Sequence, residues 1–146
     1  MVDLEAWYDA DHDGPTVVRT PAELDAVLDV VAGWEGRIIV DVYVVANPAR
    51  AVFNIGVHGQ AGRGALYYSG DSGSWFSKGT PGPDRSPTEP ILYYYMNNDT
   101  EFPGDCEIPL DVVRRAAHEF MTTGGERPTV TNWQPRPPVP QAASAE

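Results

Sequence analysis

Three consecutive tyrosines, Tyr93, Tyr94 and Tyr95, constrain the fold of this chain more than any other feature of its sequence. The side chains of a strand alternate between its two faces, so these three rings cannot all enter one core. At least one ring therefore points outward, just ahead of the polar stretch that begins at Asn97. Two interpretations follow: an aromatic surface that recognises a partner, or a strand covered on both faces for structural reasons.

The segment TPAELDAVLDVVAG, residues 20–33, predicts the first helix. Thr20 is the expected N-cap, Pro21 the first helical residue, and Glu23 the residue that completes a capping box. Apolar residues then recur on one stripe of the helix, and Gly33 is the expected stop. The stripe contains Leu24, Val27, Leu28 and Val31.

Alternating apolar residues after this helix predict a run of strands. Residues 38–44 and 51–58 alternate in this way, and further short strands are expected at 65–69 and around Trp75. Strands joined by such short turns pair in antiparallel fashion. A loop rich in Gly and Pro, residues 78–90, then precedes the tyrosine strand. A loop of that length is either functional or mobile.

The second helix is expected to start at Pro109, with Ile108 as a poor N-cap, and a final strand, TVTNW, follows at 129–133. This order predicts an α+β fold with a single domain, one mainly antiparallel sheet of about five to seven strands, and two main helices. The domain should span residues 1–134, and the Pro- and Ala-rich tail 135–146 should be disordered. The apolar face of the second helix contains Leu110, Val113, Ala117, Phe120 and Met121.

The chain is strongly acidic, with ten basic and 21 acidic residues and a net charge of −11. Phosphate contacts need clustered Lys and Arg, so direct nucleic-acid binding is disfavoured. An acidic surface instead attracts basic proteins and accelerates their encounter. The alternative is that the acidity only keeps the protein soluble. Acidic residues cluster in 1–36 and again in 99–111.

We expect a cytoplasmic protein without a membrane segment. The single cysteine, Cys106, gives no disulfide framework and favours a reducing compartment. No apolar run approaches the roughly 20 residues that span a bilayer. The acidic first residues, MVDLEAWYDADHDG, lack the basic and apolar regions of a secretory signal.

Metal sites and cofactors are not expected. Asp9, Asp11 and Asp13 copy the first half of a calcium loop, but the twelfth position is Thr20, which is needed as a helix cap. His118-Glu119 begins a zinc protease motif, but Thr122 stands where the second histidine should be.

Catalysis is not expected either. Cys106 lies between Asp105 and Glu107, and like charge disfavours its thiolate. His58 could act as a general base, but it lies at a strand end with no evident partner.

The expected partner-binding surface lies on the tyrosine strand and the acidic loop after it. If Tyr93 and Tyr95 share the core face with Ile91, then Tyr94 points away, beside Leu92 and Met96. That face would be aromatic and bordered by carboxylates, as expected of a binding hot spot with a polar rim. In the competing view, the second helix covers this face and buries Tyr94. The expected partner-binding residues are Tyr94, Asn97, Asn98, Asp99 and Glu101.

Several segments, in the right order, resemble the first-numbered immunity-protein family of bacterial polymorphic toxin systems. The resemblance runs from Leu4 to Trp133, except for the 78–90 loop. Its most distinctive piece is EIPLDVVRRAAHEF, followed by TGGERP and a tryptophan. The other segments are LEAWYD, TPAELDAVLD, LYYSGD and PILYYYMNNDTEFP.

The resemblance implies a non-catalytic antitoxin that binds a cognate toxin C-terminal domain, often a nucleic-acid deaminase. Such a domain holds nucleic acid in a basic groove, which an acidic and aromatic surface can cover. Two other hypotheses remain open. One is an acidic interaction module with a basic partner that is not a toxin. The other is a small enzyme or calcium-dependent binder that uses residues 9–14 or His58.

Overall fold

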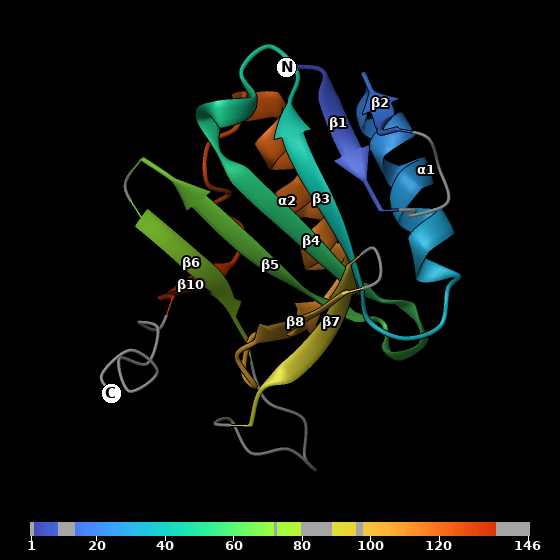
Figure 1. The fold of residues 1–146 in the computed structure, drawn as a ribbon, viewed down its shortest axis with the longest axis vertical. Helices are drawn as coiled ribbons and strands as arrows, with labels where there is room; N and C mark the ends of the chain where they lie inside the picture. Colours follow the sequence, from blue (N-terminus) through green and yellow to red (C-terminus); the bar gives the residue numbers. More distant parts are fainter. Residues whose placement is uncertain (1, 9–13, 72, 80–88, 96–97, 137–146) are drawn as a thin grey trace.

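The computed structural model describes residues 2–8, 14–71, 73–79, 89–95 and 98–136. Within these ranges it contains one sheet of ten strands and two α-helices (Figure 1). The predicted α+β class with a mainly antiparallel sheet is confirmed, although the sheet has more strands than expected. The strands are β1 (Leu4–Trp7), β2 (Thr16–Val18), β3 (Ile38–Val44), β4 (Val52–His58), β5 (Arg63–Gly70), β6 (Gly73–Lys78), β7 (Ile91–Tyr95), β8 (Asn98–Phe102), β9 (Ile108–Pro109) and β10 (Asn132–Pro135).

The main path of the sheet runs in the order β10-β6-β5-β4-β3-β1-β2, and every pair along it is antiparallel. The central hairpins from β3 to β6 follow the alternation that predicts them. The final strand starts three residues later than the predicted 129–133 and ends at Pro135. The residues after 136 lie outside the described part, so the disordered tail stays a prediction.

Helix α1 (Pro21–Ala32) begins as the sequence predicts. The Thr20 hydroxyl accepts a hydrogen bond from the Glu23 amide at 3.1 Å, and Pro21 occupies the first turn. The Glu23 carboxylate turns back to accept the Arg19 amide at 2.6 Å, one residue before the N-cap amide that the predicted capping box would use. The predicted apolar stripe is buried against the sheet. These local contacts fix where the helix starts and which side faces the core.

Helix α2 (Leu110–Thr123) begins one residue later than predicted. Its N-cap is Pro109 rather than Ile108, and Pro109 has no side chain that could accept a hydrogen bond from the first turn. At the other end Gly124 has a φ of 77°, a left-handed conformation that glycine adopts without strain. The Gly125 amide then bonds the Phe120 carbonyl at 2.9 Å. The helix therefore stops at the predicted Gly124-Gly125 pair.

Both helices pack on the same face of the sheet and enclose the main core. Phe120 from α2 stacks on Phe53 from β4 with ring centroids 4.4 Å apart. The two helices are also joined by a polar contact, in which Asp25 accepts from Arg114 at 3.2 Å and lies 3.1 Å from His118. Neither described helix is long and apolar enough to span a membrane.

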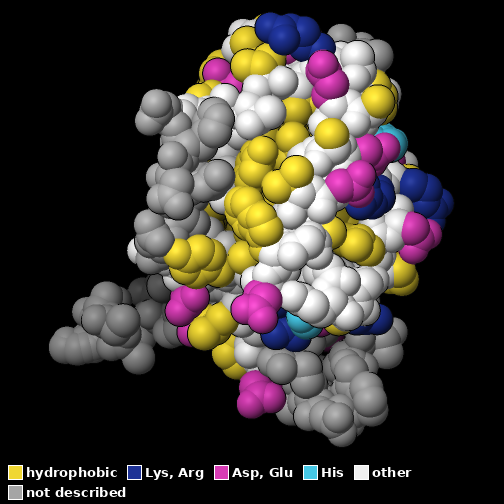
Figure 2. All heavy atoms as spheres, turned by 90° about the vertical axis from the view of Figure 1, so that its right-hand side faces the viewer, with side chains coloured by type: hydrophobic (Ala, Val, Ile, Leu, Met, Phe, Trp, Pro, Cys, Tyr) yellow, Lys and Arg dark blue, Asp and Glu magenta, His cyan; other side chains and the backbone are white. Residues whose placement is uncertain are grey.

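The outer surface of α1 and β2 carries some exposed apolar area. Val30 is 50% exposed and Val17 is 39% exposed. Figure 2 shows this side of the molecule, where a band of hydrophobic side chains lies beside several carboxylates. Isolated exposed valines are common on protein surfaces. The exposure of Val30 and Val17 alone therefore does not mark a binding surface.

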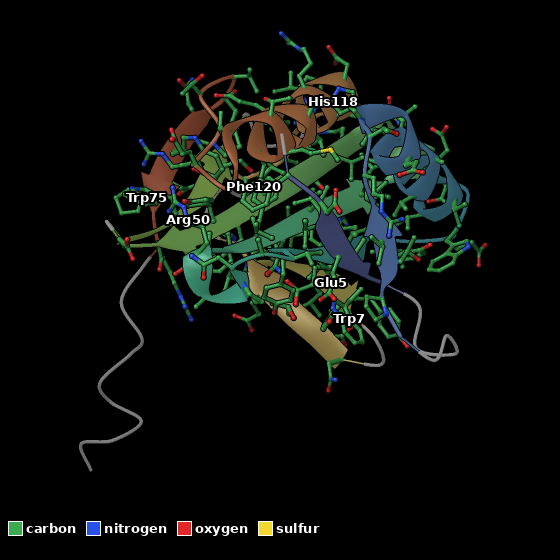
Figure 3. The ribbon with its side chains drawn as sticks, turned by 90° about the horizontal axis from the view of Figure 1, so that it is seen from above. Glu5, Trp7, Arg50, Trp75, His118 and Phe120 are labelled. Carbon is green, nitrogen blue, oxygen red and sulfur yellow. The ribbon has the colours of Figure 1, made fainter. Side chains whose placement is uncertain are left out.

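The second face of the sheet is covered in part by the β7–β8 hairpin. In Figure 1 this hairpin lies in front of the sheet, whereas α2 lies behind it. The hairpin joins the sheet through β7, which pairs with β3 in parallel at Ile38 and Tyr94. Figure 3 shows that Glu5 and Trp7 of β1 lie on this same side, opposite Phe120 and His118 of α2. Among the described residues, the sheet therefore has one face under helices and one face that is only partly covered.

Strand β8 is a departure from the sequence prediction, which places an acidic loop at these residues. Asn98–Phe102 pairs with β7 along its whole length. Asn, Asp and Glu have low strand propensity, so local composition favours a loop here. The strand forms because its last residue, Phe102, enters a second apolar core with β7. This contact joins segments that are distant in sequence and leaves no local signal.

Candidate partner-binding surface

The β7–β8 hairpin is held by a small core on the second face of the sheet. Its inner residues Ile91, Tyr93 and Phe102 are buried against Phe76 of β6 and neighbouring apolar residues. The Tyr93 and Phe102 rings are 4.8 Å apart, and the Phe76 and Phe102 rings are 5.0 Å apart. These edge and tilted contacts fix the hairpin on the sheet. The predicted inward direction of Tyr93 is therefore confirmed.

Tyr93 reaches the sheet because Gly56 of β4 leaves space for its ring. A Cβ atom at position 56 would lie 2.6 Å from the Tyr93 ring. This distance is too short for a van der Waals contact between two carbon atoms. The hydroxyl of Tyr93 then extends past the apolar core and donates to Glu107 at 2.8 Å. The hairpin is thus anchored by both packing and a hydrogen bond to a buried carboxylate.

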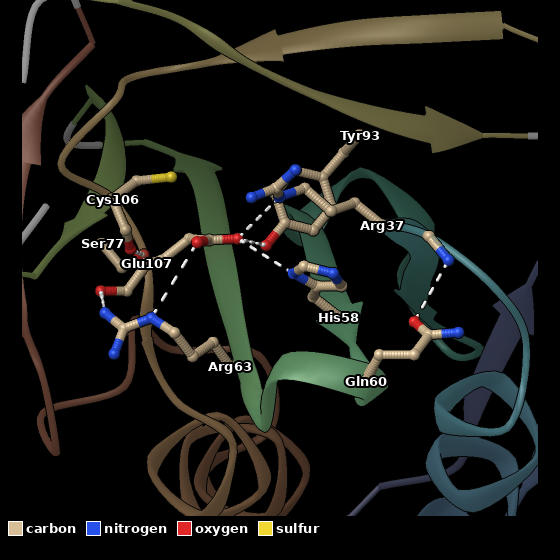
Figure 4. Close-up of polar contacts among 9 residues, drawn as sticks. Arg37, His58, Gln60, Arg63, Ser77, Tyr93, Cys106 and Glu107 are labelled. Atoms are coloured by element: carbon tan, nitrogen blue, oxygen red, sulfur yellow. Dashed lines mark hydrogen bonds and ion pairs between the residues drawn. The ribbon is translucent and has the colours of Figure 1, made fainter. Parts of the chain in front are cut away.

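Glu107 is the centre of a buried polar cluster (Figure 4). Its carboxylate accepts from Arg37 Nε at 2.9 Å and lies 3.9 Å from Arg63 Nε. Burial raises the pKa of Glu107, but the hydrogen bonds from Arg37 and Tyr93 outweigh it, and the pKa lies below its usual value. The carboxylate is therefore ionised at neutral pH and is paired with cations.

His58 belongs to this cluster, which corrects the expectation that it has no evident partner. Its Nδ1 atom lies 3.9 Å from the Glu107 carboxylate, without a hydrogen bond among the described residues. Burial and the neighbouring Arg37 lower the pKa of His58, although Glu107 acts in the opposite direction. Because Glu107 is far away in sequence, no spacing pattern around His58 could have indicated the contact.

The outer face of the hairpin carries the exposed side chains. Leu92 pairs with Glu101, and Tyr94 pairs with Asp99, so these four residues share one face. Leu92 is 51% exposed and Tyr94 is 41% exposed. The result is a strip in which the apolar Leu92 side chain lies beside Glu101 and the Tyr94 ring lies beside Asp99. We call these four residues the hairpin face.

The structure brings together three of the five predicted residues, Tyr94, Asp99 and Glu101. Asn98 is exposed but pairs with Tyr95, so it lies on the alternate face at the end of the hairpin. Asn97 and the predicted neighbour Met96 lie outside the described residues. The competing view, in which the second helix buries Tyr94, is wrong because α2 packs on the opposite face.

A second polar cluster on the same side of the sheet was missed by the sequence analysis. Asp41 of β3 accepts from the Tyr43 hydroxyl and from Asn54 Nδ2, each at 2.8 Å, and the Tyr95 side chain lies nearby. Burial raises the pKa of Asp41, and these hydrogen bonds offset the rise only in part. The alternation of β3 places Asp41 and Tyr43 on one face, but only the strand pairing shows what surrounds them.

The described residues contain neither a cluster that could bind a metal ion nor a reactive thiol. No group of three or more His, Cys, Asp or Glu among the described residues could hold a metal ion. The predicted absence of a calcium site concerns residues 9–13, which lie outside the described ranges. Burial, together with Glu107 and Asp105, raises the pKa of Cys106 to about 12. The thiol is therefore protonated at neutral pH, as its acidic neighbours predict.

The profile of the family described as Immunity protein Imm1 matches residues 12–135. No curated protein matches the chain. The family match covers both helices and the β7–β8 hairpin. Because the match spans most of its length, the chain belongs to the Imm1 family of immunity proteins.

Proposed function

We propose that this protein is an antitoxin that blocks the C-terminal domain of a cognate toxin by stoichiometric occlusion. Membership of an immunity-protein family supports binding to a toxin. The observation that carries the proposed mode of binding is the hairpin face, where Tyr94 and Leu92 are exposed beside Asp99 and Glu101. A rigid aromatic residue in an acidic setting suits a basic protein partner.

We propose a nucleic-acid deaminase as the toxin. Such an enzyme holds its substrate in a basic groove and turns a base into a zinc pocket. The carboxylates of Asp99 and Glu101 can take the place of phosphates, and the Tyr94 ring can take the place of a stacked base. The net charge of −11 favours the encounter with a basic domain and disfavours binding to the nucleic acid itself.

The antitoxin acts without catalysis and in the cytoplasm, where such a toxin would damage the nucleic acid of the producing cell. The buried cluster around Glu107 supports this non-catalytic role. Its carboxylate is occupied by Arg37 and Tyr93, which hold the hairpin in place. The cluster thus serves to position the binding surface.

The test is co-expression with the toxin domain encoded by the neighbouring gene. We expect wild-type protein to restore growth and to form a complex at a one-to-one ratio in which toxin activity is lost. Full inhibition at strongly substoichiometric protein would indicate enzymatic inactivation and contradict the proposal. Failure of the two purified proteins to associate would instead favour an interaction module with another basic partner.

The hairpin face is tested with Tyr94→Ala and Asp99→Ala. Each change should raise the Kd for the toxin domain about tenfold or more, with the melting temperature unchanged, because both side chains are exposed. Val30→Ala, on the outer surface of α1, is the matched control and should leave the Kd unchanged. A Kd that changes with Val30→Ala but not with Tyr94→Ala would move the interface to the helix side.

A further inference from the structure

The part of the second sheet face that the hairpin leaves uncovered is built around Asp41. Its hydrogen-bond partners are neutral: the Tyr43 hydroxyl and the side-chain amide of Asn54. Among the described residues, Asp41 forms no ion pair, in contrast to Glu107, which is paired with arginine. A largely buried carboxylate without a cation is costly to keep ionised, and a cation from a partner would offset that cost.

The residues around Asp41 form a continuous, partly exposed row across the sheet. Asp41 lies opposite Trp7 of β1 and Asn54 of β4, and Asn54 lies opposite Tyr67 of β5. Paired residues share a face, so these side chains all lie on the second side of the sheet. Each of Trp7, Asn54 and Tyr67 is only partly buried. Asp41 is itself 9% exposed, and the partly exposed side chains around it are those that an incoming residue would contact first.

The charge of this row is negative. Glu5 of β1 lies opposite Tyr43, next to Asp41 on the same face, and forms no ion pair among the described residues. Arg136 lies over the Tyr67 ring at 5.7 Å, two strands away from Asp41, whereas Arg37 and Arg63 contact Glu107. Aromatic rings that flank a carboxylate suit a guanidinium, which can stack on a ring while it donates to an anion.

We infer that this open sheet face is a second part of the toxin interface, and that Asp41 receives an arginine side chain of the toxin domain. The inference rests on the proposed function and extends it. Tyr95 connects the two parts, because it ends strand β7 and lies near Asp41; burial and this carboxylate together raise the pKa of Tyr95. A basic domain seated on the hairpin face can thus continue across the sheet toward β1. The charge of −11 supplies the complementarity that such a partner needs.

The experiment compares Asp41→Asn with Asp111→Asn. Both changes remove one negative charge, but Asp111 is exposed on α2, on the other side of the sheet. For Asp41→Asn we expect the Kd for the neighbouring toxin domain to rise about tenfold or more, because an arginine loses its buried partner. Asp111→Asn should change the Kd by less than about twofold. The melting temperature of Asp41→Asn should fall only slightly, because Oδ1 can still accept from Asn54 and Nδ2 can donate to the Tyr43 hydroxyl.

Binding of the wild-type protein shows whether a negative result contradicts the proposed function or only the Asp41 inference. If wild-type protein does not bind the toxin domain, the proposed function fails. If wild-type protein binds and Asp41→Asn binds equally tightly, only the Asp41 inference is overturned.

Should Asp41→Asn not fold, Glu5→Gln decides, since Glu5 lies on the same face. A threefold or larger rise in its Kd, on the order expected for a rim charge, supports the inference, and an unchanged Kd overturns it.

Discussion

Glu107 shows how a single residue joins distant parts of the chain. Its carboxylate is reached from Arg37 before β3, from Tyr93 of β7 and from Arg63 of β5. Each partner belongs to a different segment, so the contact exists only after the sheet has formed. The sequence shows Glu107 as one carboxylate of an acidic stretch and gives no sign that it is buried. Partners so far apart in sequence cannot be inferred from local spacing.

Replacing Glu107 with Gln should destabilise the protein. The change leaves Arg37 without the charge of the carboxylate that it contacts at 2.9 Å in a largely buried setting. We expect the free energy of unfolding near neutral pH to fall by about 3 kcal/mol. Urea denaturation measures the change. Glu101→Gln is the matched control, because Glu101 is exposed on the hairpin face, and it should cost less than about 0.5 kcal/mol.

The same variant should respond less to acid. The pKa of Glu107 is lower in the folded protein than its ordinary value of 4.5. Its stabilisation is therefore fully present above that ordinary value and is lost as the pH falls through the lower folded value. The difference in stability between wild-type and Glu107→Gln protein should narrow on acidification below about pH 4.5. A difference that stays constant over this range would show that Glu107 is not ionised in the fold.

At the level of elements, the helices could be predicted better than the strands. Thr20, Pro21 and Glu23 lie within four residues of one another, so the start of α1 is a local property. The pairs β1–β2 and β7–β8 depend on contacts across the second face and at the edge of the sheet. The sequence predicts the outward direction of Tyr94 from alternation alone, but not the strand β8 that places Asp99 beside it.

Gly56 should be required for the position of the β7–β8 hairpin. In Gly56→Ala the new methyl group would collide with the Tyr93 ring. We expect a loss of about 1–3 kcal/mol in unfolding free energy, because the hairpin must shift to make room. Hydrogen exchange at the Tyr94 amide, which bonds the Arg37 carbonyl at 2.8 Å, should accelerate.

Gly14→Ala is the control for this substitution. A Cβ at position 14 would meet nothing within 4 Å. The unfolding free energy of the Gly14→Ala protein and the exchange rate of its Tyr94 amide should remain at wild-type values. Equal effects of the two substitutions would indicate that backbone entropy, rather than a collision with Tyr93, explains the loss.

For the whole molecule, charge should control how fast the complex forms. The net charge of −11 acts over the distance between approaching proteins, whereas the hairpin face and Asp41 act at contact. Raising the salt concentration from about 50 to about 500 mM should slow association with the toxin domain about tenfold or more. The dissociation rate should change less. Stopped-flow measurements give both rates, and a salt-independent association rate would mean that the acidity serves only solubility.

The ends of the sheet have a consequence for behaviour at high concentration. Exposed sheet edges can pair with a strand of another copy and start aggregation. Here the main path ends in β2, which has three residues, and in β10, which has four and finishes at Pro135. Strand β8 carries Asp99 and Glu101, so two copies meeting there would repel each other. The two ends of the main path are therefore poor templates for pairing with a strand of another copy.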